Sequence, residues 1–435
     1  MKPPLSKHFQ SRVPSPIRLS QIEFQKRTDH VVAVNTAIGN VSLPMHPAMI
    51  KRMLSLGASD SPLREGVVKY SPTIGEKETN QTFLHLIASS GFSTQGLYAQ
   101  VTDGGSQAME LAILGVCGPA GSKTGPLLLI DPAYSNYGSM AERTGRSTVV
   151  VTRHLEENGK FTLPQLSVIE KVIKESKPAA LLVIPYDNPT GQFFPQSTLN
   201  ELASLCVKYN LWLISDEAYR EVFYTGDQPS CVWGITEKEV PGITGRRISI
   251  ESASKIWNAC GLRIGALITD NKDFHEKAIA ENTANLCSNS IGQYIFGSLF
   301  HESKEQLQAW FQKQRAYYRK ISEDLTTNLK KLMPKLIVSS PDSSLYTVVD
   351  VRNILGPDFN ANKFVMYCAQ KGTVPIKGED KTLLVAPMDG FYSPSSGSPN
   401  PGKTQMRIAY VEPPEIMAEV PQLFAQLLKD FQSSY

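Results

Sequence analysis

The sequence predicts an α/β protein in which helices cover a mostly parallel sheet of seven strands, joined to a smaller α+β domain. Between about residues 90 and 270, seven short apolar runs rich in β-branched residues alternate with longer segments whose apolar residues recur at helical spacing. Such alternation is typical of a parallel sheet that is buried on both faces. The length of 435 residues also exceeds what one hydrophobic core usually supports, which favours two domains.

The elements follow from these patterns in chain order. The seven predicted strands are "YAQVT", "GPLLLI", "STVVVT", "AALLVI", "LWLIS", "RISIE" and "GALIT". A helix over "AWFQKQRAYYRKISEDLTTNLKKL" is expected to bridge the domains. Beyond it, the strand-like runs "KLIVSS", "SLYTVVDV", "TLLVAP" and "MRIAYV" mix with helical segments such as "KFVMYCAQKG". We therefore expect a large domain over residues 51–315, and an N-terminal arm and small α+β domain over residues 1–50 and 316–435.

Three further segments complete this outline. The final stretch "EIMAEVPQLFAQLLKDF" has a helical pattern, and Pro421 is expected to delay the start of its helix. The Ser-, Pro- and Gly-rich stretch at 393–404 predicts a loop, either a plain connection or a border of the functional site. Four prolines in the first sixteen residues disfavour an amphipathic transit helix, so the N-terminus is interpreted as an extended arm.

Composition narrows the class of protein. Net charge is +3 from 44 basic and 41 acidic residues, without a dense basic block, which argues against nucleic acid as a partner. No apolar run approaches the ~18 residues of a membrane span. The six cysteines lie far apart and show no metal-ligand spacing, so reduced thiols, no metal and a cytoplasmic location are expected.

Five polar motifs follow directly after predicted strands. They are "TDGGSQA", "DPAYSNYG", "PYDNPTG", "DEAYREV" and "SASK". Because ligand sites in parallel α/β sheets form beyond the carboxyl ends of the strands, we expect these motifs to meet at one site. Each motif alone is a weak signal, whereas their convergence is a strong one.

Several of these residues are suited to binding a phosphate. Glycines before a helix let backbone N–H groups approach an anion, and an arginine can hold phosphate with two parallel hydrogen bonds. The expected donors are Gly105, Ser106, Gln107, Ser252, Ser254 and Arg263. No Walker or G-x-G-x-x-G pattern is present, so ATP and NAD are not the expected ligands, and an oxidoreductase of the Rossmann type is disfavoured.

Lys255 lies among these donors. A lysine crowded by Arg263 in a cleft has a lowered pKa and a nucleophilic amine, which suits a Schiff base with a phosphate-bearing aldehyde. Asp216 ends an apolar strand, where it could pair with a protonated pyridine nitrogen. Asn188 and Tyr219 could bind the ring's phenolic oxygen, and Tyr134 could stack on the ring. Taken singly, each residue also has an ordinary explanation: a helix cap, a salt bridge with Arg220, a turn, or core packing.

The motif S-x-S-K-x5-G-x-R-x-G, with "NPTG" and D-x-A-Y upstream, resembles the class I/II aminotransferases, which are pyridoxal-phosphate enzymes of fold type I. The likeness spans nearly the whole chain, which looks like the aspartate-aminotransferase-like branch of the family. It implies pyridoxal 5'-phosphate as cofactor and a homodimer. It also implies that Lys255 is the Schiff-base lysine and proton shuttle, that Asp216 faces the pyridinium, and that Tyr219 and Asn188 bind the ring's 3-hydroxyl.

The resemblance extends to the substrate side. Arg407 in "MRIAY" matches the arginine that binds the substrate α-carboxylate, and Gly39 in "NTAIGN" matches a glycine near the substrate. Tyr70 resembles a tyrosine that reaches the phosphate from the partner subunit. Several dicarboxylate-specific relatives use a second arginine downstream of the lysine, but this sequence has none between Arg263 and Arg315.

The implied function is transfer of the amino group of an L-amino acid, possibly aspartate, to a 2-oxo acid such as 2-oxoglutarate through a Lys255 Schiff base. The alternatives are a β-lyase or decarboxylase on the same fold, and a non-catalytic regulatory protein that binds the cofactor.

Overall fold

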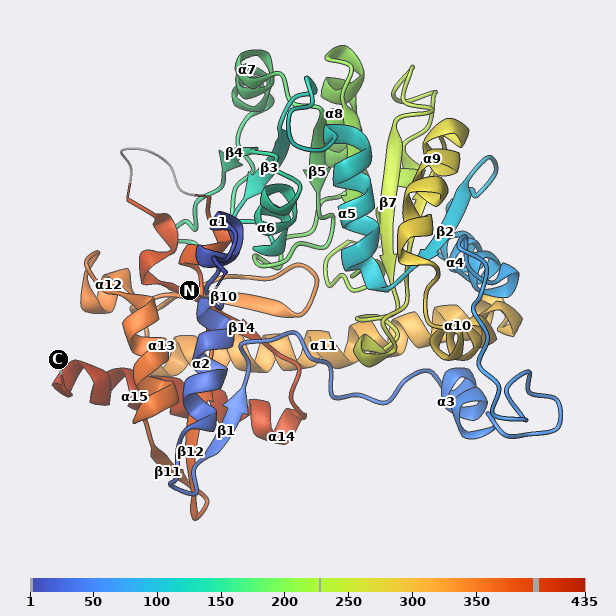
Figure 1. Ribbon diagram of the computed structural model, residues 1–435. Coiled ribbons are helices and arrows are strands. Elements are labelled where there is room, and N and C mark those ends of the chain that lie inside the picture. The colour runs from blue at the N-terminus through green and yellow to red at the C-terminus, as the bar shows by residue number, and fades with distance from the viewer. Residues whose placement is uncertain (1–2, 227, 394–398, 435) are drawn as a thin grey trace.

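The computed structural model describes residues 3–226, 228–393 and 399–434, and its large domain is built on a seven-stranded sheet (Figure 1). All seven predicted runs form strands of this sheet. In spatial order they are β2 (Tyr98–Thr102), β8 (Gly265–Thr269), β7 (Arg247–Ser252), β6 (Trp212–Asp216), β5 (Ala180–Val183), β3 (Leu127–Asp131) and β4 (Thr148–Thr152). Strand β8 is antiparallel to both neighbours and the other pairs are parallel, which confirms the predicted mostly parallel sheet.

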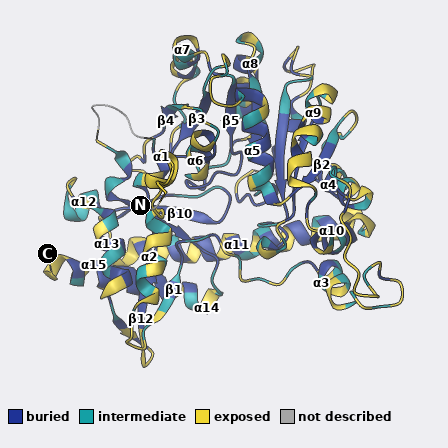
Figure 2. Ribbon diagram, viewed as in Figure 1, coloured by how far each residue is buried: buried dark blue, intermediate teal, exposed yellow. Residues whose placement is uncertain are grey.

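Helices cover both faces of the large sheet. Along β3, Leu127 and Leu129 pack into a cluster with one set of helices, while Leu128 and Ile130 pack into the cluster on the opposite face. This alternation explains why the strands read as continuous apolar runs, since successive side chains point to opposite faces and both are buried (Figure 2). The first face carries α5 (Gly104–Cys117), α6 (Asn136–Arg143) and α9 (Lys272–Asn282), and the second carries α4 (Lys77–Ser89), α7 (Leu166–Ser176) and α8 (Gln196–Lys208).

The small domain contains two further sheets. The first is antiparallel and has the order β13 (Ala386–Pro387), β14 (Gln405–Ala409), β10 (Tyr346–Asp350) and β9 (Ile337–Val338). The second has the order β1 (Val32–Asn35), β12 (Glu379–Leu384) and β11 (Val374–Ile376). Its helices are α12 (Arg352–Leu355), α13 (Ala361–Gln370), α14 (Pro414–Met417) and α15 (Val420–Ser434), so the last helix begins next to Pro421, as predicted.

One long helix joins the two domains. Helix α11 (Lys304–Leu332) contacts α4 of the large domain and α15 of the small domain, and Figure 1 shows it running below the large sheet and on into the small domain at the left. Ser303 and Gln306 form a reciprocal capping box at its start. The predicted bridging helix is therefore confirmed, and the predicted boundary between residues 315 and 316 falls inside it. Two shorter helices, α3 (Pro47–Leu54) and α10 (Ser290–Gly297), pack together near its N-terminal end.

The N-terminal arm differs from its predicted extended form. Residues Lys7–Gln10 form the short helix α1, and Pro16–Gln25 form α2. Pro16 occupies the first turn of α2, where its missing N–H breaks no helical hydrogen bond, and the Ser15 side chain caps that turn. The expectation of an extended arm was wrong for this segment, because prolines at a helix start are compatible with the helix that follows.

Two other expectations concern absences and the Ser/Pro/Gly-rich stretch. Among the residues that the structure describes, no helix is long and apolar enough to cross a bilayer, and no cluster of three or more metal-ligating side chains occurs. Part of the predicted 393–404 loop, residues 394–398, lies outside the described residues. Residues Pro401–Thr404 form a short 3-10 turn that leads into β14.

Candidate active site

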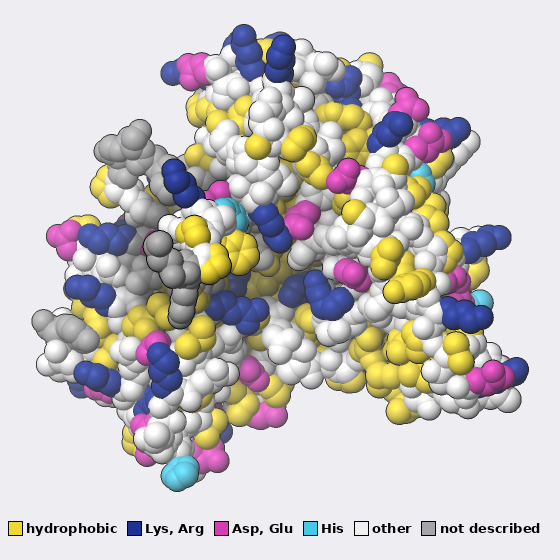
Figure 3. Space-filling model, in the orientation of Figure 1, with side chains coloured by type: hydrophobic (Ala, Val, Ile, Leu, Met, Phe, Trp, Pro, Cys, Tyr) yellow, Lys and Arg dark blue, Asp and Glu magenta, His cyan; other side chains and the backbone are white. Residues whose placement is uncertain are grey.

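A cleft of about 760 Å³ lies between the carboxyl ends of the large sheet and the small domain. Figure 3 shows a hollow in the middle of the molecule with Lys and Arg side chains on its sides. Most of the residues predicted from the strand-end motifs and the resemblance line this cleft: Gly39, Gly105, Ser106, Tyr134, Asn188, Asp216, Tyr219, Ser252, Ser254, Lys255, Arg263 and Arg407. The fold thus brings together side chains that are up to 368 positions apart, from Gly39 to Arg407.

Lys255 follows β7 and extends across the cleft. Its Nζ donates a hydrogen bond of 2.6 Å to the backbone oxygen of Gly39. A Cβ at position 39 would lie 2.2 Å from the Tyr346 hydroxyl and 3.3 Å from Lys255 Nζ, so this close approach of chain and lysine requires a glycine. The lysine amine is therefore held at the boundary between the two domains.

The start of α5 provides an anion-binding surface. The backbone N–H groups of Gly105 and Ser106 belong to the first turn of this helix, and no side chain caps them. Gly104 has φ +74°, and a Cβ there would lie 2.3 Å from Nη2 of Arg263. Only glycine lets this guanidinium lie so close to the helix start. The Ser252 hydroxyl accepts the N–H of Ser254 at 3.0 Å, which fixes the turn before the lysine.

Asp216 is a half-buried residue whose carboxylate lies at the end of β6. The Tyr137 hydroxyl donates to its Oδ2 at 2.5 Å, and the N–H of Ala218 donates to its Oδ1 at 3.1 Å. Burial raises the pKa of Asp216, and these two hydrogen bonds oppose that rise. Neither donor carries a full positive charge, so the carboxylate is available to pair with a cation in the cleft.

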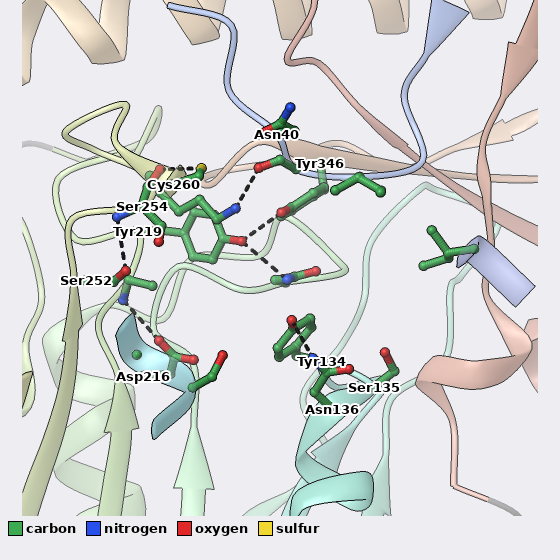
Figure 4. Close-up of a pocket in the computed structure, with 18 of the residues that line it drawn as sticks. Asn40, Tyr134, Ser135, Asn136, Asp216, Tyr219, Ser252, Ser254, Cys260 and Tyr346 are labelled. Atoms are coloured by element: carbon green, nitrogen blue, oxygen red, sulfur yellow. Dashed lines mark hydrogen bonds between the residues drawn. The ribbon is translucent and has the colours of Figure 1, made fainter. Parts of the chain in front are cut away.

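A chain of hydrogen bonds crosses from the large domain to the small one. The Asn188 amide donates to the Tyr219 hydroxyl at 3.3 Å, and the hydroxyls of Tyr219 and Tyr346 are 2.7 Å apart. Figure 4 shows these two phenols pointing toward each other, one from the segment after β6 and the other from the start of β10. Burial, followed by the proximity of Tyr346, raises the pKa of Tyr219 well above its ordinary value, so this phenol is protonated at neutral pH.

Arg407 on β14 completes this chain. Its Nη1 donates to Asn188 Oδ1 at 2.8 Å and its Nη2 to the backbone oxygen of Ala37 at 2.7 Å. The guanidinium carbon lies 4.3 Å from the ring centre of Tyr346 and 4.8 Å from that of Phe391. Its buried Nε has no hydrogen-bond partner among the described residues. A buried arginine with an unused donor in an open cleft is suited to binding an anionic ligand.

Two predicted site residues lie outside the cleft lining. The Gln107 side chain is engaged elsewhere: its Oε1 accepts the N–H of Asp103 at 2.6 Å and its Nε2 donates to Asn282. Tyr70 is 81% exposed and lies on the surface, with Val67 and Val68 also exposed beside it. Within one chain, then, neither side chain belongs to the cleft.

The sequence did not single out three residues that contribute to the cleft. Tyr346 and Phe391 pack against Arg407, and Arg18 reaches the lining from α2. Tyr346 lies in "SLYTVVDV", which reads as an ordinary apolar strand. Arg18 lies in the segment expected to be extended. Tyr346 and Arg18 do not directly follow a strand of the large sheet. A position directly after such a strand was the signal by which most of the other residues were predicted.

Comparisons with known proteins identify the family of this chain. Residues 34–382 match the model of the family "Aminotransferase class I and II". The chain is 23% identical over 382 residues to the aspartate/prephenate aminotransferase of Thermus thermophilus, covering 86% of this chain and 91% of that protein. It is 25% identical over 251 residues to human kynurenine–oxoglutarate transaminase 3, covering 54% of this chain and 52% of the relative.

Solved structures confirm the predicted fold. The N-succinyldiaminopimelate aminotransferase of Mycobacterium tuberculosis superposes with a TM-score of 0.80 at 19% identity, covering 98% of this chain and all of the other. A Thermus thermophilus aspartate aminotransferase mutant gives a TM-score of 0.78 at 21% identity, with coverage of 98% and 100%. Because the family model spans most of the chain, the predicted family is confirmed, and this protein belongs to the class I and II aminotransferases.

Proposed function

We propose that this protein binds pyridoxal 5'-phosphate in the cleft and transfers the amino group of an L-amino acid to a 2-oxo acid. The observation that carries the proposal is the convergence of Lys255, Asp216, Arg263 and Arg407 on one cleft. The family depends on this cofactor. The remaining question is whether the side chains of this particular chain fit it.

The donor set fits each part of the cofactor. The uncapped start of α5 and the guanidinium of Arg263, close against Gly104, suit a phosphate dianion. The carboxylate of Asp216 suits a protonated pyridine nitrogen, because that pairing supplies the positive charge that its two hydrogen-bond donors lack. Asn188 and Tyr219 carry hydrogen-bond donors that would suit a phenolic ring oxygen, and Tyr134 offers an aromatic face.

The chemistry divides between the cofactor and the chain. When bound, pyridoxal phosphate supplies an electron sink for the substrate α-carbon. Arg407 binds the substrate α-carboxylate, its charge being held in place by Asn188, Ala37 and two aromatic rings. The Lys255 amine takes the proton from the α-carbon as a general base and later returns one as a general acid, which contributes on the order of 10²–10⁴-fold to the rate. The backbone oxygen of Gly39 orients that amine.

We further propose that the active unit is a homodimer in which Tyr70 of one subunit serves the cleft of the other. Tyr70 is 81% exposed, and the apolar side chains of Val67 and Val68, shortly before it in the chain, are also exposed. Large apolar side chains grouped on a surface are characteristic of an interface between proteins. A tyrosine standing outside its own cleft is the residue that a second copy of the chain would use.

Absorption spectroscopy of the protein loaded with pyridoxal phosphate tests the transferase activity. Adding single L-amino acids, without any acceptor, should change the cofactor spectrum and release one equivalent of 2-oxo acid per bound cofactor. Lys255→Ala should retain its fold by circular dichroism and lose the reaction by at least about 100-fold. Release of ammonia with continuous formation of oxo acid would instead identify a lyase, and an unchanged reaction in Lys255→Ala would refute the proposed mechanism.

A further inference from the structure

Helix α2 places a charged side chain in the cleft, on the side of the small domain. Ile17, Ser20 and Phe24 recur at helical spacing; Ser20 is buried, and Ile17 and Phe24 pack against an apolar cluster of the small domain. Arg18 and Gln21 lie on the adjoining face of the helix and line the cleft. The packing of α2 therefore determines where Arg18 points.

Among the residues that the structure describes, the Arg18 guanidinium has no acidic partner. Its Nη1 donates to the Oε1 of Gln21 at 3.1 Å, but within the described part of the chain it forms no ion pair. By contrast Arg12, six residues earlier, forms an ion pair with Glu142. An arginine that lines a cleft without a carboxylate can bind one supplied by a ligand.

Tyr134 lines the same cleft as this guanidinium. Burial raises the pKa of Tyr134, and the positive charge of Arg18 is among the effects that oppose this rise. Asn136 Nδ2 donates to the Tyr134 hydroxyl oxygen at 2.8 Å, which leaves the hydroxyl proton free to be donated elsewhere. Figure 4 shows Tyr134 and Asn136 side by side on one wall of the cleft. This part of the cleft thus combines a cation with a neutral donor.

The proposed function gives a role to Lys255, Arg263 and Arg407 but none to Arg18. Lys255, Arg263 and Arg407 have partners in the proposed function: the α-carbon proton, the cofactor phosphate and the substrate α-carboxylate. Besides Asp216, the carboxylate that lines the cleft is Glu412, which follows β14 and forms no ion pair with Arg18. The cleft therefore has one positive charge more than the proposed reaction uses.

We propose that Arg18, together with the hydroxyl of Tyr134, binds a carboxylate at the end of the substrate side chain. The substrates would then be amino acids and 2-oxo acids with acidic side chains. This inference rests on the proposed function, since it places the side chain of a substrate whose α-carboxylate is bound by Arg407. It assigns recognition of the side chain to the N-terminal helix.

Binding of non-reacting acids tests the inference without turnover. Titration calorimetry on the cofactor-loaded protein would compare glutarate, with two carboxylates, and pentanoate, which has the same chain length and one. We expect glutarate to bind more tightly, and Arg18→Gln to weaken glutarate about 10-fold or more while changing pentanoate less than about twofold. Arg12→Gln is the matched control and should change neither. Equal affinity for both acids, or equal effects of Arg18→Gln on both, would overturn the inference.

A kinetic comparison separates this inference from the proposed function. For the reaction of loaded protein with L-glutamate and L-glutamine, which differ in charge at the side-chain end, Arg18→Gln should lower the kcat/KM ratio about 10-fold or more. If both amino acids react and the ratio is unchanged, the side-chain assignment is wrong and the transferase stands. If no amino acid reacts but glutarate binding still depends on Arg18, the carboxylate site stands and the proposed reaction is wrong.

Discussion

Replacing Arg407 by lysine should weaken substrate binding while leaving the cofactor in place. The arginine is 4% exposed, and its two terminal nitrogens already serve Asn188 and the backbone of Ala37. A planar guanidinium can keep these bonds and still present its edge, including the unused Nε, to a carboxylate. A lysine has one nitrogen for all of these acceptors, so it must give up either its internal partners or the parallel bonds to the ligand.

The size of the effect follows from the number of bonds lost. A hydrogen bond that involves a charged group contributes about 1.5–3 kcal/mol, and Arg407→Lys removes at least one such bond from the carboxylate while retaining the charge. At about 1.4 kcal/mol for each factor of ten, kcat/KM for an amino acid should fall about 10- to 150-fold. The rings of Tyr346 and Phe391, at 4.3 and 4.8 Å, continue to support a cation at this position.

The assay is the single-turnover rate of the loaded variant with a series of amino acid concentrations, together with a titration of pyridoxal phosphate into the protein. We expect the loss in the substrate dependence, and cofactor affinity within about threefold of the native protein. Arg315→Lys is a suitable control, because Arg315 also lies over an aromatic ring, Phe223 at 4.7 Å, and pairs with Glu221, yet does not line the cleft. A loss below threefold for every donor, or an equal loss of cofactor affinity, would refute this assignment.

Three other predictions test the hydrogen-bond chain, one buried acid and the dimer. Tyr346→Phe keeps the ring beneath Arg407 but removes a hydroxyl that lies 2.7 Å from the Tyr219 hydroxyl. When Tyr219 donates to the phenolic oxygen of the cofactor, the Tyr346 hydroxyl can donate to Tyr219 and strengthen that bond, so the pKa at which the bound cofactor's absorbance titrates should rise by about 0.4–1 unit in the variant. An unchanged spectral titration would contradict this. Burial raises the pKa of Glu217 to about 7, so its stabilising contribution is complete below about pH 4.5 and is lost as pH rises through 7. Urea unfolding at pH 5 and pH 8 should therefore show a smaller decrease in stability with pH for Glu217→Gln than for the native protein, and equal decreases would count against the shift. The Tyr70→Ala and Lys255→Ala variants should each be poorly active alone. When the two are mixed, half of the dimers contain one subunit of each, and such a dimer has one site with both Lys255 and the partner's Tyr70, so roughly a quarter of native activity should return. No gain on mixing would exclude a shared site.

The large-domain part of the cleft was predictable because it depends on one topological rule. Asp216 and Ser252 are the last residues of β6 and β7, and Asn188 follows β5, so the parallel order of the strands alone brings them to one edge of the sheet. Their residue types are also unusual after apolar runs. Local pattern and topology were together sufficient for these positions.

The small-domain part was harder to predict because it depends on how the domains pack. Tyr346 reaches Tyr219 through an interdomain contact that no local pattern encodes, and its own segment is apolar and strand-like. Arg18 depends on α2, which begins at the last of four N-terminal prolines; these prolines predicted an extended arm, although Pro16 lies in the first turn of the helix. Gln107 shows the converse: its motif predicted a ligand, but Asn282, far along the chain, provides a structural partner.

This division has a consequence for substrate specificity within the family. In the proposed function, the groups that match the cofactor, among them Asp216 and Arg263, belong to the large domain, whereas Arg407 and Arg18 come from the small domain and the N-terminal helix. A change in α2 can therefore alter which side chain is bound without disturbing the cofactor contacts. Proteins similar to this chain bear names of different substrates, including aspartate and kynurenine. The residues that determine which substrate is bound should therefore be sought in the segments that cover the cleft, rather than in the motifs that identify the family.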